Sequence, residues 1–388
     1  MNILFVQHGN YGQAWQSFRD GGPETYRDQR ISVDYVSGLA QQHSVTVLAL
    51  CDVVHDTELA PGLRSIGVVR ADFDAAAVAA LMQDVQPDLL ICRSPVYSVL
   101  RAAGRRDIPT LACFADIFAP GGLRTRLRNR RLRQVLAGSN VVGVANHSLN
   151  ASRSLARTVG VPPERIIPWD WSRISELGPV KTQVADATRP RLFFAGAMTA
   201  DKGVGDCLSA LRLLHDRGIA AELSLAGREK SGEWREMAAR LGLQDAVHFL
   251  GLIPNTDVRR RMMAHDIVTV PSRHSYPEGL PNTLYEALAS RSALVVSDHP
   301  AFEGRIGAGH ACMEFAGSDP AALAEAVAQL CQDPALYARL SENAEKALDG
   351  LYFGIEWTAL MDHFIADPAN HGGWVARHAL PVLEAAQH

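Results

Sequence analysis

The six cysteines are scattered without any C-x-x-C pair, and no apolar run reaches the roughly 18 residues that a membrane-spanning helix needs. The cysteine spacing therefore indicates neither a zinc site nor a disulfide framework, which fits a reducing cytoplasm. The amino terminus, MNILFVQHG, lacks the basic segment of a secretory signal and leads directly into an apolar strand. We predict a cytoplasmic protein that is not secreted by a cleaved signal and does not cross a membrane.

The sequence also lacks an excess of basic residues. Its 38 Lys and Arg against 42 Asp and Glu give a net charge of −4, which argues against a general nucleic-acid or polyanion binder. With 388 residues, 47% of them apolar and 21% charged, the chain has the composition of a globular protein and the length for two domains of ordinary size.

Short apolar runs rich in β-branched residues alternate with longer amphipathic stretches in both halves of the chain. This alternation predicts buried parallel strands with helices on both faces of each sheet. The pattern fades over a polar, proline-containing stretch, 173–190, which we interpret as a linker. We predict an α/β protein with an amino-terminal domain at 1–172, a second domain at 191–353, and carboxyl-terminal helices at 354–388 that pack back towards the first domain.

One loop carries the most informative pattern, because EGLPNTLYE places Glu278 and Glu286 eight positions apart at the end of a predicted strand. Open parallel sheets bind ligands at that end of their strands. A helix beginning near Asn282 would offer the free N–H groups of Asn282, Thr283 and Leu284 to an anion such as a diphosphate. Glu286 could accept from a ribose diol, and Glu278 from a second sugar. The spacing alone leaves open that the loop only starts a helix and that both glutamates are solvated.

The same loop resembles the E-x7-E segment of the family 4 (GT4) retaining glycosyltransferases, which have the GT-B fold. The resemblance extends over nearly the whole chain in the family's order: the glycine-rich first loop, helix and second strand at 21–48, the segment that closes the first domain at 159–169, and the strand, loop and K-G that open the second domain at 193–211. It implies two doubly wound Rossmann-like domains that face each other across a cleft.

The resemblance also implies roles for individual residues. Glu278 matches the glutamate that contacts the donor sugar, and Lys202 matches the lysine that neutralises charge on the departing diphosphate, so these two are the expected catalytic residues. Glu286 matches the glutamate that holds the ribose. The remaining expected donor-binding residues are Gly21, Gly22, Ile253, Gly279, Leu280, Pro281, Asn282 and Thr283, with Leu252 beside Ile253 near the base. Ordinary packing at a strand end is an equal alternative for Leu252 and Ile253.

The sequence departs from the family at a position that bears on catalysis. The family commonly has an arginine next to the glycine of the second domain's first strand, where this chain has Ala197. The missing guanidinium removes one cation from a site that must stabilise charge on the leaving group. Arg273 and Arg228 are the candidates to supply it.

Two further departures fall in the first domain. Many members have a histidine where this chain has Ala115 before Asp116, in the loop on the acceptor side. The familiar PNG after the linker strand is replaced by PWDW at 168–171. His147 and His299 stand at strand ends and could line the cleft, although a structural hydrogen bond is the more common role of such a histidine.

Asp72 and Asp74 form a D-x-D pattern that resembles a metal motif of the other major glycosyltransferase fold. Asp74 stands at the start of an alanine-rich helix, where it is a natural N-cap. We therefore predict no metal site there. Gly203 and Gly205 after Lys202 fit neither a dinucleotide-binding nor a Walker pattern.

Six arginines with interspersed leucines cluster between Arg124 and Arg133. A basic amphipathic helix of this kind can contact anionic lipid headgroups or a diphosphate-linked acceptor. A solvated helix is the alternative. If the first interpretation holds, the protein is peripheral at the inner face of the membrane.

These observations predict a retaining glycosyltransferase that moves a sugar from a UDP- or GDP-sugar to a hydroxyl of a saccharide or lipid-linked acceptor, in polysaccharide, glycolipid or glycoconjugate synthesis. No cofactor or metal is expected if lysine and the helix dipole carry the charge. The alternatives are a sugar-nucleotide-binding protein of the same fold without activity, and a phosphorylase or epimerase of that fold.

Overall fold

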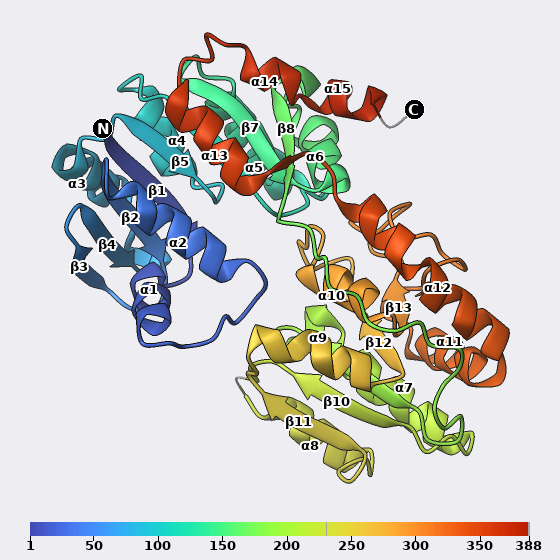
Figure 1. Cartoon of the computed structure of the whole chain (residues 1–388). Coiled ribbons are helices and arrows are strands. Elements are labelled where there is room, and N and C mark those ends of the chain that lie inside the picture. Colours follow the sequence, from blue (N-terminus) through green and yellow to red (C-terminus); the bar gives the residue numbers. More distant parts are fainter. Residues whose placement is uncertain (230, 387–388) are drawn as a thin grey trace. The chain divides into compact units, whose positions relative to one another are not determined.

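The computed structural model describes residues 1–229 and 231–386, which divide into two compact units. Unit 1 contains residues 1–22, 28–172 and 353–388, and unit 2 contains residues 23–27 and 173–352. Each unit is built around one sheet flanked by helices (Figure 1). The stretch 173–190, predicted as a linker, lies within unit 2, and the last helices lie within unit 1.

Unit 1 has a nine-stranded sheet in the order β15-β8-β7-β6-β5-β1-β2-β4-β3, parallel except for the β3–β4 pair. Its strands are β1 (Asn2–His8), β2 (Ser44–Leu50), β3 (His55–Ala60), β4 (Leu63–Val68), β5 (Leu89–Cys92), β6 (Thr110–Phe114), β7 (Val141–His147), β8 (Ile166–Asp170) and β15 (Ile355–Glu356). Its helices are α1 (Tyr11–Arg19), α2 (Gln29–Leu39), α3 (Ala75–Val85), α4 (Tyr97–Gly104), α5 (Leu123–Leu136), α6 (Leu149–Ser154), α13 (Trp357–Ala366), α14 (Trp374–Arg377) and α15 (Leu380–Ala385).

Strand β1 shows why this sheet is covered on both faces. Leu4 and Val6 belong to one buried cluster with residues of α3, α4 and α5, whereas Ile3 and Phe5 belong to a second with residues of α1, α2 and α13. Successive side chains of a strand point to opposite faces, so an uninterrupted apolar run requires helices on both. The predicted doubly wound arrangement follows from this.

The end of the chain completes unit 1. Strand β15 pairs with β8, and the buried carboxylate of Asp170 accepts hydrogen bonds from the backbone N–H groups of Trp171, at 2.8 Å, and Phe353, at 3.2 Å. Trp357 of α13 is fully buried, at 5.6 Å from the ring of Trp171. The PWDW segment therefore anchors the returning chain.

Unit 2 has a six-stranded parallel sheet in the order β11-β10-β9-β12-β13-β14. Its strands are β9 (Arg191–Ala195), β10 (Glu222–Ala226), β11 (Val247–Gly251), β12 (Ile267–Val270), β13 (Ala293–Ser297) and β14 (Met313–Phe315). Its helices are α7 (Val204–Asp216), α8 (Glu233–Arg240), α9 (Asn255–Ala264), α10 (Asn282–Ser290), α11 (Pro320–Gln332) and α12 (Pro334–Leu351). Helix α10 begins at Asn282, as the sequence predicts, because Pro281 fixes the backbone before it.

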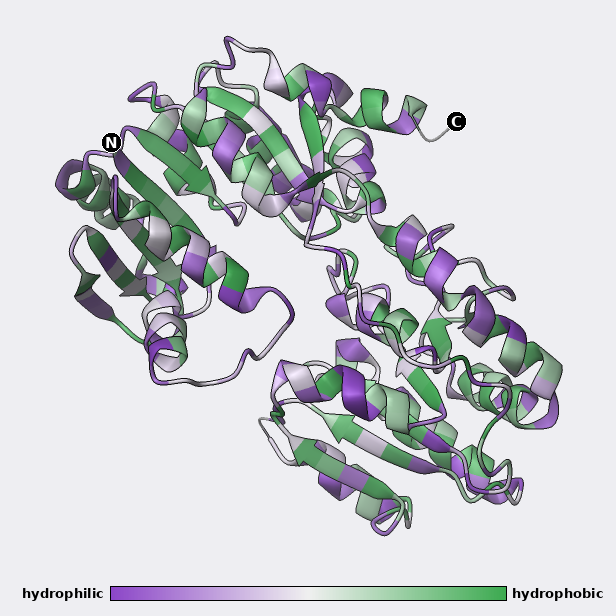
Figure 2. Cartoon of the chain, in the orientation of Figure 1, coloured by the Kyte–Doolittle hydropathy of each residue, from purple (hydrophilic) through white to green (hydrophobic). Residues whose placement is uncertain are grey.

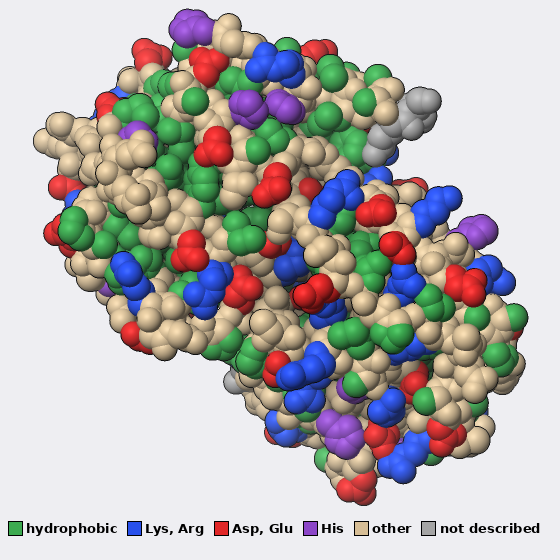
Figure 3. Space-filling view, in the orientation of Figure 1, with side chains coloured by type: hydrophobic (Ala, Val, Ile, Leu, Met, Phe, Trp, Pro, Cys, Tyr) green, Lys and Arg blue, Asp and Glu red, His purple; other side chains and the backbone are tan. Residues whose placement is uncertain are grey.

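Apolar residues run along the strands of both sheets, while the helices carry both apolar and polar residues (Figure 2). Figure 3 shows one face of the molecule, and over unit 2 on this face the acidic and basic side chains are interspersed. Within residues 1–229 and 231–386, every helix is too short or too polar to cross a membrane.

Candidate active site

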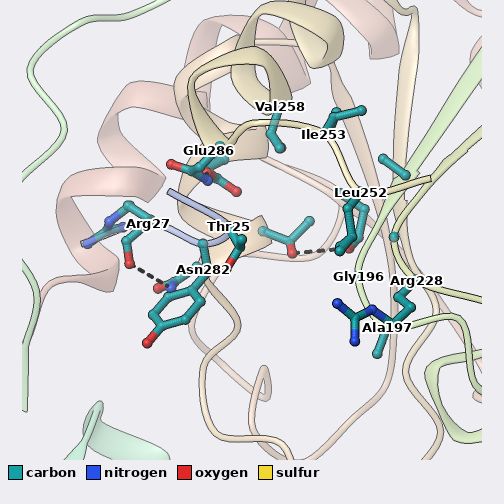
Figure 4. A pocket seen from close by; sticks show the side chains of 16 residues that line it. Thr25, Arg27, Gly196, Ala197, Arg228, Leu252, Ile253, Val258, Asn282 and Glu286 are labelled. Carbon is teal, nitrogen blue, oxygen red and sulfur yellow. Dashed lines mark hydrogen bonds between the residues drawn. The ribbon is translucent and has the colours of Figure 1, made fainter. Parts of the chain in front are cut away.

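A cavity of about 320 Å³ opens at the carboxyl end of the unit 2 sheet. Its walls come from the loops after β9, β10 and β11, the start of α10, and the segment 23–27. The lining residues are Thr25, Tyr26, Arg27, Ala195, Gly196, Ala197, Ala226, Gly227, Arg228, Leu252, Ile253, Asn255, Val258, Asn282, Thr283 and Glu286 (Figure 4). Parallel sheets bind ligands at this end, and the volume suits a small molecule.

The start of α10 offers both an anion site and a hydroxyl acceptor. The prediction of a free N–H is wrong for Leu284, which donates to the carbonyl of Pro281 at 3.0 Å and so closes the first turn of the helix. The backbone N–H groups of Asn282 and Thr283 have no hydrogen-bond partner among the described residues. Glu286, one turn later, is buried and accepts a hydrogen bond from the amide of Asn255 at 2.5 Å. The cavity can therefore bind an anion at the helix N-terminus and a polar group at Glu286.

Lys202 and Glu278 form a direct ion pair, although they are 76 positions apart in the chain. The ammonium group also lies 4.6 Å from the centre of the Tyr276 ring. The second carboxylate oxygen of Glu278 accepts from the hydroxyl of Ser272. With side-chain exposures of 13% and 8%, this pair is mostly shielded from water, so its charges are weakly screened.

Two local features fix the pair. Gly203 follows Lys202 with φ of 77°, and an added Cβ would lie 2.2 Å from the carbonyl oxygen of Pro271, so only glycine fits. On the other side, the buried His299 accepts from the N–H of Ala301 through Nδ1 and donates through Nε2 to the carbonyl of Tyr276, at 3.0 Å. Burial lowers the pKa of His299, which keeps this neutral tautomer. His299 therefore supports the loop and is not a cavity residue.

The part of the chain that contains this site is similar to a known protein family. Residues 180–347 match the sequence model of the family described as "Glycosyl transferases group 1". The chain carries a group 1 glycosyltransferase domain. The match confirms the expected transferase at the level of this domain, which falls within unit 2 and contains the Lys202–Glu278 pair and most of the cavity.

Curated relatives agree with this assignment, and a solved structure shows the fold. The chain is 28% identical over 210 residues to a glycogen synthase of Mycobacterium tuberculosis, covering 52% of this chain and 49% of that protein. It is 39% identical over 103 residues to the lipopolysaccharide core biosynthesis mannosyltransferase LpcC of Rhizobium leguminosarum, covering 26% and 28%. The chain thus spans about half the length of the first curated relatives it matches. Anabaena HepE, solved with UDP and glucose, superposes with a TM-score of 0.68 at 16% identity, over 96% of this chain and all of that chain. The predicted GT-B fold is confirmed.

Only some of the predicted donor-binding residues line the cavity. Glu286, Asn282, Thr283, Leu252 and Ile253 line the cavity. Gly279, Leu280 and Pro281 are buried in the same loop and do not line it, and neither do Lys202 and Glu278. The roles that the resemblance implies for these five residues remain predictions.

Gly21 and Gly22 belong to unit 1 and follow the C-cap of helix α1. The N–H of Gly22 donates to the carbonyl of Ser17 at 2.7 Å, and an added Cβ on Gly22 would lie 2.3 Å from the Ser17 hydroxyl. This close approach explains the glycine structurally. Contact of either residue with a donor phosphate remains a prediction.

The residues that follow those glycines line the cavity, and sequence reasoning missed them. The backbone N–H of Asn255 donates to the carbonyl of Glu24 at 2.8 Å, and the side-chain amide of Asn282 donates to the carbonyl of Arg27 at 3.4 Å. The guanidinium of Arg27 lies over the ring of Tyr285, at 4.5 Å. Segment 23–27 thereby becomes part of the group 1 domain's cavity. The signal in the sequence is the glycine-rich loop, because residues 23–27 directly follow Gly21 and Gly22.

The two candidates for the missing cation differ. Arg273 forms a fork-like ion pair with Asp206, at 2.6 and 2.9 Å, and the Asp206 side chain is only 4% exposed. Arg228 lines the cavity together with Ala197 (Figure 4). Of the two, only Arg228 is placed to meet a ligand there.

The remaining candidates have structural partners. Asp74 caps α3 by accepting from the N–H groups of Ala76 and Ala77, both at 2.9 Å, as predicted. His147 is buried and lies 3.3 Å from the carboxylate of Asp170. Residues 1–229 and 231–386 contain no group of three or more His, Cys, Asp or Glu side chains arranged to hold a metal ion.

Proposed function

We propose that the protein is a retaining GT4 glycosyltransferase that transfers a sugar from a UDP- or GDP-sugar to an acceptor hydroxyl. The observation that carries this proposal is the cavity of the group 1 domain, where Glu286 and the free N–H groups at the start of α10 lie one helical turn apart. That spacing suits a ribose and a diphosphate of one nucleotide. HepE, of the same fold, has been solved with UDP and glucose, which supports the choice of donor class.

In the proposed reaction, Glu286 binds the ribose, and the backbone N–H groups of Asn282 and Thr283 bind the diphosphate. Glu278 accepts hydrogen bonds from the transferred sugar, and Lys202 exchanges part of its pairing with Glu278 for the phosphate oxygens as negative charge grows there. The departing phosphate takes the proton of the acceptor hydroxyl, so no protein nucleophile is required. The acceptor class is a saccharide or a lipid-linked saccharide, as in polysaccharide or glycolipid synthesis.

A panel of UDP- and GDP-sugars, assayed for release of the free nucleotide diphosphate, tests the proposal. Release that depends on an added acceptor supports a transferase. Binding without turnover would indicate a sugar-nucleotide-binding protein instead. Sugar 1-phosphate formed from a saccharide and inorganic phosphate would indicate a phosphorylase, and a change in the sugar's configuration without transfer an epimerase.

We further propose that the enzyme is cytoplasmic and contacts the inner face of a membrane through α5. All six arginines of this helix are exposed, and none pairs with a carboxylate among the described residues. Leu123 and Leu127 are 83% and 49% exposed on the same helix. Unpaired cations beside exposed leucines suit anionic headgroups above an acyl layer.

Replacing Arg124, Arg128 and Arg131 with glutamate is expected to release the protein from vesicles that contain phosphatidylglycerol. Each arginine near an anionic surface contributes about 1 kcal/mol, so loss of three attractions weakens binding by at least ~100-fold. Vesicle sedimentation measures this. The control reverses Arg101, Arg105 and Arg106, which are exposed and change the net charge equally. If the unaltered protein does not sediment, a soluble acceptor is favoured and the membrane proposal is wrong.

A further inference from the structure

The loops after β9 and β10 approach each other unusually closely. The N–H of Gly196 donates to the carbonyl of Ala226 at 2.9 Å, and an added Cβ on Gly227 would lie only 1.8 Å from the carbonyl oxygen of Gly196. Gly227 has φ of 154°, which also favours glycine. The N–H of Met198 then donates to the carbonyl of Arg228 at 3.3 Å. Residue 228 is therefore held beside Ala197.

Ala197 leaves open the space that the side chain of Arg228 enters. Figure 4 shows the guanidinium of Arg228 directed into the cavity, next to Ala197. On the other side of the same loop, the hydroxyl of Thr283 donates to the carbonyl of Ala195 at 3.3 Å. The guanidinium and the free amides at the start of α10 thus border one cavity from two sides of the β9 loop.

The charge of Arg228 is not neutralised by the protein. Among residues 1–229 and 231–386, its guanidinium has neither an ion pair nor a hydrogen bond, and it is exposed. The adjacent carboxylate of Glu229 accepts from the N–H of Trp234 at 2.9 Å and pairs with Arg235 at 3.2 Å. By contrast, the charge of Lys202 is already balanced by Glu278.

We propose that Arg228 binds the diphosphate of the donor, in the space left by Ala197, and so supplies the cation that the loop after β9 lacks. This inference rests on the proposed function. A guanidinium donates two parallel hydrogen bonds to phosphate oxygens, which a lysine cannot do. The amides of α10 approach the same anion from the opposite side.

Calorimetry with three probes, uridine, UMP and UDP, and with the matching guanine series, tests the proposal. In Arg228→Ala the affinity for the diphosphate is expected to fall by at least ~10-fold, as for a lost charged hydrogen bond, while the nucleoside binds as before. Adding Ala197→Arg to that variant is expected to restore most of the loss, because the new guanidinium enters the same space. Arg240→Ala is the control, since Arg240 is exposed in the same unit and does not line the cavity.

An unchanged affinity for the diphosphate in Arg228→Ala would overturn the inference, as would an equal loss for nucleoside and diphosphate. If Ala197→Arg fails to restore binding, an arginine at position 197 does not reach the space that we assign to the Arg228 guanidinium. If the unaltered protein binds neither UDP nor GDP, the proposed function fails and this inference fails with it. Binding of UDP or GDP by the unaltered protein therefore distinguishes failure of the Arg228 inference alone from failure of the proposed function.

Discussion

Lys202→Ala is expected to lower the turnover of the donor by at least ~100-fold while the fold is kept. As the bond to the sugar breaks, negative charge grows on the departing phosphate, and the partly buried ammonium of Lys202 is the proposed partner of that charge. Loss of one preorganised donor at such a site typically costs about 2.7 to 4 kcal/mol, or ~100- to 1,000-fold in turnover. Steady-state release of nucleotide diphosphate measures the effect.

Several variants make this result specific. Lys346→Ala removes an exposed lysine of α12 and is expected to be silent. Because Lys202→Ala leaves Glu278 buried without its cation, Lys202→Ala/Glu278→Gln removes the unpaired charge, and thermal unfolding of both variants separates lost stability from lost catalysis. Near-normal turnover in Lys202→Ala would show that another cation, with Arg228 the first candidate, holds the phosphate.

Glu286→Gln is expected to weaken binding of the free nucleotide diphosphate by ~30-fold. A carboxylate that accepts two hydrogen bonds from a ribose diol makes charge-assisted bonds, and their replacement by neutral ones costs about 2 kcal/mol for the pair. Isothermal titration calorimetry measures the loss directly. Glu233→Gln, at an exposed position of α8, is the matched control.

A 2′-deoxy nucleotide diphosphate assigns the loss to the ribose. The unaltered protein is expected to bind the deoxy ligand more weakly than the ribose ligand, whereas Glu286→Gln discriminates much less between them. Such coupling between one side chain and one hydroxyl group identifies a direct contact. Equal discrimination in both proteins would place the ribose elsewhere and remove this role from Glu286.

The elements around the cavity could be predicted because each depends on local sequence. The strands are continuous apolar runs, α10 starts where Pro281 fixes the backbone, and α3 starts where Asp74 caps it. Strand β3 could not be predicted in this way, because it pairs only with β4, none of its residues is buried, and its sequence HDTELA has no apolar run.

The arrangement inside the cavity depends on contacts between distant parts of the chain. Segment 23–27 has no hydrophobic period. Its place is set by hydrogen bonds that its carbonyl groups accept from the backbone of Asn255 and the side chain of Asn282, over more than 200 positions. The difference between the two arginines also depends on distant contacts. Arg273 pairs with the carboxylate of Asp206, whereas Arg228 lines the cavity. Neither feature has a signature in a single stretch of sequence.

The division of the chain has a consequence for its synthesis. Residues 173–352 form nearly all of unit 2 and leave the ribosome before β15 and α13, which complete unit 1. Until then, the apolar cluster on one face of the first sheet, which includes Trp169 and Trp171, lacks Trp357 and Phe364. Unit 2 therefore has all but five of its residues in one continuous stretch to fold from, while the nascent first unit keeps an apolar surface exposed and vulnerable to aggregation until the last segment is made.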